Sequence, residues 1–184
     1  MLSLFRHIPN TLTVLRIVLV VPFVLALCNQ QHLTALVLLS LAGLTDVLDG
    51  FLARKFQWYS WFGSVADPVA DKTLMVTTYF TLGFLGHLPV WLVYTVIGRD
   101  VLIFLGSLMY WRVLGQFEGK PTILGKLCTF FLVAYALIVV ASLTILPVSD
   151  EMLAAGGVII AIFCGVSACQ YVFIGFMDIR NKCR

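Results

Sequence analysis

Carboxylates are concentrated in one short part of this sequence. Four of the nine acidic residues are Asp46, Asp49, Asp67 and Asp71, and the members of each pair are three or four positions apart. Such spacing places each pair on one face of a helix. Converging carboxylates repel one another and need a counter-charge. Oxygen-only ligands favour Mg²⁺, Mn²⁺ or Ca²⁺ over zinc, and Mg²⁺ commonly joins carboxylates to substrate phosphates. The spacing therefore predicts a divalent-metal site for a pyrophosphate-containing substrate.

The elements that position these residues are apolar enough to lie in a membrane. The chain is 61% hydrophobic and 11% charged, with a mean hydropathy of +1.02, whereas soluble domains are about 45–50% apolar and about 25% charged. A span needs roughly 20 apolar residues, and six stretches qualify, at about 9–28, 33–53, 68–86, 89–111, 122–146 and 152–176. We predict an all-α integral membrane protein with about six transmembrane helices, forming one domain over residues 1–184. Residues 2–10 form either a short interfacial helix or a frayed start to the first span.

Basic residues are confined to one side of this arrangement. Of the 12 Lys and Arg residues, only Arg16 and Arg99 lie well inside spans, and the loops on the opposite side contain none. The positive-inside rule then places both termini and the acidic cluster on the cytoplasmic side. The net charge of +3 is explained by this topology and by anionic lipid headgroups, not by nucleic acid.

The two aspartate pairs fall at the cytoplasmic ends of the second and third spans. Because the connection is short, we expect these helices to be antiparallel neighbours whose carboxylates converge. The structural alternative is that the aspartates cap helices or pair with Arg54, Lys55 and Lys72. Clusters of ionisable residues inside a membrane are functional by default, which favours the metal site.

The same segment resembles a family signature. The pattern D-x2-D-G-x2-A-R-x8-G-x3-D-x3-D runs without a gap from Asp46 to Asp71, and it resembles that of the CDP-alcohol phosphotransferases. Its eight fixed letters give a chance match on the order of 10⁻¹⁰ per start position. The six-span pattern is also similar to that family, so the resemblance covers essentially the whole chain.

The resemblance implies an enzyme of phospholipid biosynthesis that transfers a phosphatidyl group from CDP-diacylglycerol to an alcohol and releases CMP. It implies two divalent ions, Mg²⁺ or Mn²⁺, and a homodimer. Asp71 would be the general base as well as a metal ligand. The metal ligands would be Asp46, Asp49, Asp67 and Asp71, and the CDP-lipid pocket would contain Thr45, Gly50, Ala53, Arg54 and Gly63.

The acceptor alcohol is less clearly indicated. Ile8-Pro9-Asn10 with Thr13 and Arg16 resembles the bacterial phosphatidylglycerophosphate synthases, which implies glycerol 3-phosphate as acceptor and the bacterial inner membrane as location. The candidate cations for the acceptor phosphate are Arg99, Arg112, Lys120 and Lys126. An equally weighted alternative pairs Arg99 with Asp100 or with an aspartate of the cluster.

Other features favour different interpretations. Gly98 to Val101 and Lys120 to Lys126 resemble the CMP-forming cardiolipin synthases, which use phosphatidylglycerol as acceptor. A small cation channel or transporter would also carry acidic residues. However, these carboxylates lie at one end of two helices, and Arg54 beside them suits an anion.

Overall fold

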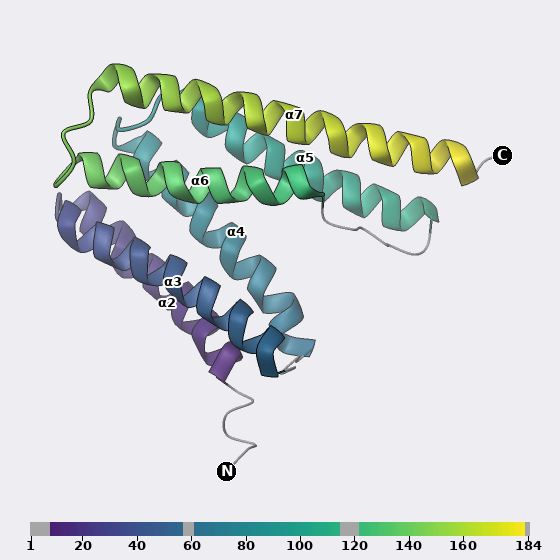
Figure 1. The fold of residues 1–184 in the computed structure, drawn as a ribbon, viewed down its shortest axis with the longest axis horizontal. Helices are drawn as coiled ribbons and strands as arrows, with labels where there is room; N and C mark the ends of the chain where they lie inside the picture. Colours follow the sequence, from purple (N-terminus) through teal and green to yellow (C-terminus); the bar gives the residue numbers. More distant parts are fainter. Residues whose placement is uncertain (1–7, 57–60, 115–121, 183–184) are drawn as a thin grey trace, which may run out of the picture. The chain divides into compact units, whose positions relative to one another are not determined.

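The computed structural model describes residues 8–56, 61–114 and 122–182, and every regular element in these ranges is an α-helix (Figure 1). Side chains are described throughout, except those of residues 8–10, 12, 47, 49–54, 61–68, 109–111, 113–114, 176 and 178–182. The helices are α2 (Ile8–Cys28), α3 (His32–Phe56), α4 (Trp61–Phe84), α5 (Val90–Leu114), α6 (Ile123–Ser142) and α7 (Asp150–Lys182). The predicted all-α fold is confirmed. The predicted interfacial helix falls largely outside the described residues.

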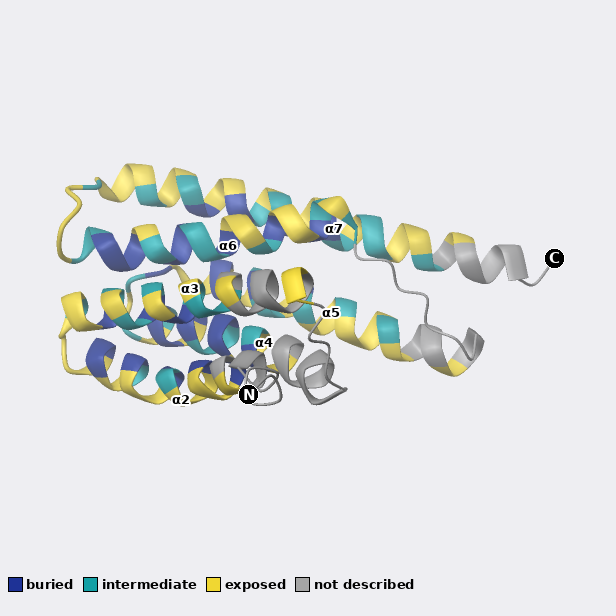
Figure 2. Cartoon of the chain, turned by 60° about the horizontal axis from the view of Figure 1, so that its bottom comes forward, coloured by how far each residue is buried: buried dark blue, intermediate teal, exposed yellow. Residues whose placement is uncertain are grey.

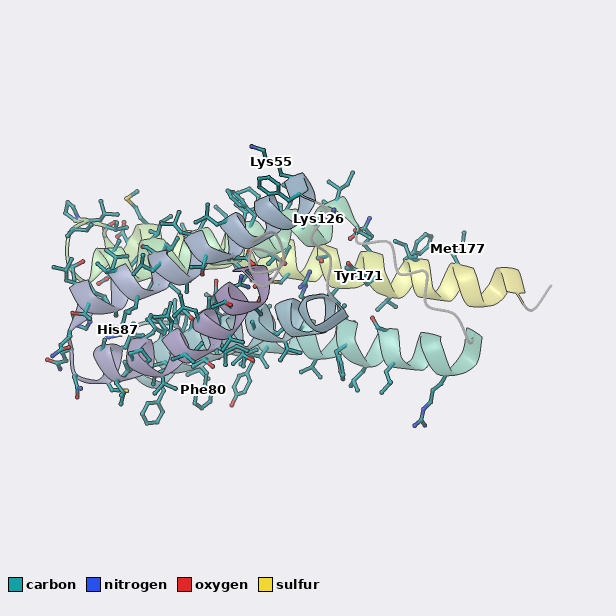
Figure 3. All side chains as sticks on the ribbon, turned by 90° about the horizontal axis from the view of Figure 1, so that it is seen from below. Lys55, Phe80, His87, Lys126, Tyr171 and Met177 are labelled. Atoms are coloured by element: carbon teal, nitrogen blue, oxygen red, sulfur yellow. The ribbon has the colours of Figure 1, made fainter. Side chains whose placement is uncertain are left out.

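The exposed surface of the described helices is largely apolar and is therefore suited to contact with lipid. Three helical segments among the described residues are long and apolar enough to cross a membrane: Val90–Leu108, Ile123–Ser142 and Asp150–Gly175. Shorter apolar stretches cover Thr13–Cys28 and His32–Asp46. Large apolar side chains face outward, and Phe80, which projects away from α4 in Figure 3, is 60% exposed. So extensive an apolar surface is not tolerated in water, and the chain is an integral membrane protein.

The helices group into two compact units. The N-terminal unit comprises residues 1–87 and 136–147, and the C-terminal unit comprises residues 88–135 and 148–184. In the N-terminal unit, α2 packs against both α3 and α4. This is a correction to the expected direct pairing of the two aspartate-bearing helices, because among the described residues the close partner of each is α2.

Periodic apolar residues explain why α2 takes this central position. Its buried positions recur every three or four residues, and Figure 2 shows them along one side of the helix. This face contains Thr13, Arg16, Val20, Phe23 and Leu27. The buried positions of α3 and α4 follow the same rule and include Ala35, Leu39 and Ala42 on α3, and Ala70, Leu74, Thr78 and Leu82 on α4. Small residues on α3 let its backbone approach α2 closely.

Tight turns close the N-terminal unit at one end. Gln30 follows α2 with φ 59°, and Gly86 follows α4 with φ 79°. Both turns return a backbone N–H to a carbonyl of the preceding helix, with His87 N to Leu82 O at 2.9 Å and Gln31 N to Ala26 O at 2.8 Å. The His32 and His87 rings meet edge to face, 5.8 Å apart between centroids.

The C-terminal unit is built on the packing of α5 against α7, with α6 also contacting α7. The Tyr135 hydroxyl on α6 donates a hydrogen bond of 2.8 Å to the Leu153 carbonyl on α7. Gly156 lies directly against the same ring, because a Cβ there would come within 2.8 Å of Tyr135 Cε2. Glycine is therefore required where the Tyr135 ring packs on α7.

Candidate active site

A buried arginine joins two aspartates of the signature in the N-terminal unit. Arg16 on α2 has a fully buried side chain. Its Nη1 atom lies 2.8 Å from Asp46 Oδ1 on α3. The same nitrogen donates a hydrogen bond to Asp71 Oδ1 on α4 and forms an ion pair with it. One guanidinium nitrogen therefore holds carboxylates from two other helices at a single point.

The packing pattern explains why these three residues meet. Arg16 continues the buried face of α2 toward its N-terminus, one turn before Val20. Asp46 lies one turn beyond Ala42 on the α2-facing side of α3, and α3 returns along α2 after a short connection. Asp71 follows buried Ala70 on α4. The polar residues are thus the continuation of three apolar faces that already pack together.

Burial differs sharply within this group. Arg16 has a side-chain exposure of 0%, whereas Asp46 and Asp71 are 46% and 43% exposed. An arginine buried in a membrane protein is costly unless it is paired, and the two carboxylates supply that pairing. Both carboxylates face accessible space, so they can contact a further cation from outside.

The donor set fits a hard divalent ion. Asp46 and Asp71 offer carboxylate oxygens around one position that a positive charge already occupies, and Mg²⁺ and Mn²⁺ prefer oxygen ligands. Among the described side chains no group of three His, Cys, Asp or Glu residues surrounds a metal position. Asp49 and Asp67 have side chains outside the described residues, so the predicted four-carboxylate site is represented by two of its members.

The remaining predicted pocket residues lie on the same two helices. Gly50, Ala53 and Arg54 fall within α3, and Gly63 falls within α4, but their side-chain surroundings lie outside the described residues. Thr45 is described, and its hydroxyl donates a 2.8 Å hydrogen bond to the Ala42 carbonyl of its own helix. The predicted contacts of these residues with a CDP-lipid remain predictions.

The candidate acceptor-binding cations belong to the C-terminal unit. Arg99 is buried and donates through Nη1 to Asp100 Oδ1 at 2.7 Å and through Nη2 to Ser167 Oγ at 2.9 Å. Of the two partners that the sequence left open, the structure shows Asp100. Arg112 is exposed in the last turn of α5 and Lys126 is exposed on α6, while Lys120 lies outside the described residues. Their role toward an acceptor stays a prediction.

Sequence reasoning missed the place of Arg16 in the cluster. It treated Arg54, Lys55 and Lys72 as the cations that could pair with the aspartates. Lys55 is exposed and points outward from the end of α3 in Figure 3. The available signal was a single arginine inside an otherwise apolar stretch, since such a charge needs a partner within the protein.

Fold and site together define a membrane-embedded helical protein whose accessible carboxylates surround a buried cation. A family model described as CDP-alcohol phosphatidyltransferase matches residues 6–169, and the chain belongs to that family. The expected resemblance is therefore confirmed over most of the chain. The family consists of transferases and is in general dependent on divalent metal.

Curated relatives with three different names are similar to this chain in sequence. A CDP-diacylglycerol–glycerol-3-phosphate 3-phosphatidyltransferase of Aquifex aeolicus is 30% identical over 148 residues, covering 78% of this chain and 80% of the relative. A probable phosphatidylglycerophosphate synthase of Mycobacterium tuberculosis is 32% identical over 180 residues, covering 94% and 83%. A CMP-forming cardiolipin synthase of Rattus norvegicus is 41% identical over 97 residues, covering 52% of this chain and only 32% of the relative.

Proposed function

We propose that this protein transfers a phosphatidyl group from CDP-diacylglycerol to glycerol 3-phosphate, giving phosphatidylglycerophosphate and CMP. The observation that carries the proposal is the meeting of Asp46 and Asp71, from α3 and α4, around one cation position while both carboxylates stay accessible. These residues begin and end the family signature. Their convergence is what a site for metal and pyrophosphate needs.

The proposed chemistry is a direct displacement. The acceptor hydroxyl oxygen forms a bond to the phosphatidyl phosphorus, the phosphoanhydride bond to the CMP oxygen breaks, and CMP leaves with the bonding electrons. Asp71 takes the proton of the attacking hydroxyl, which requires only hydrogen-bond reach. Two divalent ions held by Asp46, Asp49, Asp67 and Asp71 would neutralise the pyrophosphate and stabilise the leaving group. Thr45, Gly50, Ala53, Arg54 and Gly63 would line the CDP pocket.

The share of each chain that aligns with the named relatives favours glycerol 3-phosphate as the acceptor. The Aquifex and Mycobacterium relatives, which are named for that acceptor or its product, align over most of both chains, whereas the rat cardiolipin synthase shares one segment only. The higher local identity of that segment, 41%, supports cardiolipin synthesis from phosphatidylglycerol as the second candidate. Arg112, Lys120 and Lys126 remain the proposed cations for the acceptor phosphate. For Arg99, the hydrogen bonds to Asp100 and Ser167 favour the alternative of an internal ion pair.

The proposal includes a location and an assembly. The distribution of basic residues supports a multi-pass protein with both termini and the active site on the cytoplasmic side. The resemblance to bacterial phosphatidylglycerophosphate synthases supports the bacterial inner membrane as its location. The family match crosses both compact units, which supports a single functional domain over residues 1–184. The family resemblance supports a homodimer, which the mass of the protein in detergent would test.

The test is CMP release by the purified protein in detergent. CDP-diacylglycerol and Mg²⁺ are supplied with glycerol 3-phosphate or with phosphatidylglycerol, and a chelator serves as the control. Release that depends on glycerol 3-phosphate and stops with the chelator is the expected result. Release only with phosphatidylglycerol would replace the first candidate with the second. Absence of both CDP-lipid and metal binding would contradict the enzyme assignment and favour a small cation channel or transporter.

A further inference from the structure

The Arg16 guanidinium contacts carboxylates to which the proposed function assigns divalent metal. Its Nη1 atom contacts Oδ1 of both Asp46 and Asp71, which are two of the four proposed metal ligands. We propose that Arg16 is a built-in counter-cation that competes with divalent metal for these carboxylates. The inference rests on the metal assignment made above, and it adds a positioning residue that this assignment does not contain.

Competition follows from the shared carboxylates. Arg16 contacts Oδ1 of both Asp46 and Asp71, and a divalent ion held by the same two carboxylates would be repelled by the guanidinium. The repulsion is weakly screened because the guanidinium is removed from solvent. Metal loading therefore requires Asp46 and Asp71 to exchange at least part of their contact with Arg16 for contact with the ion.

Burial determines which group moves in this exchange. Arg16 is completely buried on the packed face of α2, between Thr13 and Val20. Asp46 and Asp71 are nearly half exposed. The carboxylates can therefore turn toward an incoming ion, while the guanidinium stays fixed in the helix packing. The fixed positive charge of Arg16 stabilises the two carboxylates when no metal is bound. It also raises the metal concentration needed to occupy the site.

Replacement of the charge provides the test. In Arg16→Gln, Mn²⁺ affinity, measured by electron paramagnetic resonance on the full-length protein in detergent without substrate, is expected to tighten on the order of tenfold, a typical coupling between two sites. The thermal midpoint without metal should fall, because two carboxylates lose their counter-charge, and saturating Mn²⁺ should restore much of the loss. Thr73→Ala, which removes an exposed hydroxyl that donates to the Val69 carbonyl of its own helix, should change neither quantity.

A second variant keeps the inference testable if Arg16→Gln fails to fold. Arg16→Lys keeps the charge but replaces the planar fork with a point charge, so it should hold the two carboxylates less firmly and tighten Mn²⁺ binding by a smaller factor. Unchanged or weaker Mn²⁺ binding in both variants would overturn the inference and make Arg16 a support for the loaded site. If wild type and variants all fail to bind Mn²⁺, the metal assignment of the proposed function fails instead.

Discussion

Each compact unit contains a buried arginine, and the carboxylates that pair with the two arginines differ in exposure and in sequence separation. Arg16 pairs with Asp46 and Asp71, which are distant in sequence, lie on two other helices and are 46% and 43% exposed. Arg99 pairs with its sequence neighbour Asp100, whose side chain is only 10% exposed, and with Ser167 on α7. Both arginines are buried, with side-chain exposures of 0% and 5%, so the main difference lies in their partners.

The exposure of the carboxylate that pairs with each arginine distinguishes a site that can exchange ligands from one that is purely structural. A carboxylate that faces accessible space can give up a contact and take another ligand with little loss of packing. A carboxylate buried with its arginine cannot, because breaking the pair leaves an uncompensated charge in a low-dielectric interior. We therefore assign chemistry to the Arg16 cluster and helix positioning to the Arg99 cluster, and the following substitutions test that division.

Asp71→Asn should produce the largest effect. The amide keeps the shape but cannot accept the acceptor proton, and general bases typically contribute about 10²–10⁴-fold to rate. CMP release should fall by about that factor, while CDP-diacylglycerol binding by the same protein stays largely intact. Thr73→Ala is the matched control on α4, because the Thr73 hydroxyl only bonds the Val69 carbonyl of its own helix. Undiminished turnover in Asp71→Asn would remove this residue as the base.

Arg99→Leu should destabilise the protein without a matching change in Mn²⁺ affinity. It leaves Asp100 buried without its main cation, and breaking a buried pair typically costs about 3–5 kcal/mol. Thermal unfolding in detergent measures the loss. The double variant Arg99→Leu with Asp100→Leu should recover much of it, since replacing both partners by apolar residues is often near neutral. Equal destabilisation of the single and double variants would contradict a structural pair.

Ser167→Ala should have a smaller effect on the same unit. The Ser167 hydroxyl accepts from Arg99 Nη2 at 2.9 Å, and its loss leaves a buried donor unsatisfied at a cost of about 1–3 kcal/mol. Unfolding should show a reduced midpoint, less affected than in Arg99→Leu. A midpoint equal to that of the wild type would mean that Asp100 alone satisfies the guanidinium.

The same comparison shows what sequence could predict. Apolar stretches located the six helices of the residues that the structure describes. However, α4 begins at Trp61 rather than near 68, and α7 continues to Lys182, because helices extend into polar sequence beyond an apolar stretch. The Arg99–Asp100 pair was one of two alternatives because its members are adjacent in sequence. The Arg16 contacts were missed because they join residues on three helices, and local spacing carries no information on which helices pack together.

A pair of histidines gives the smallest expected effect, and it lies outside both arginine clusters. Burial and the neighbouring His32 lower the pKa of His87 below its ordinary value of 6.5. The unfolded chain then binds a proton more readily than the folded one. Stability is complete above about pH 6.5 and falls as the pH drops from there through the lowered folded pKa. Thermal midpoints measured across this range should decline more in the wild type than in His87→Gln. Identical profiles would show that protonation of His87, whose ring meets that of His32 edge to face at 5.8 Å, is not coupled to the stability of these turns.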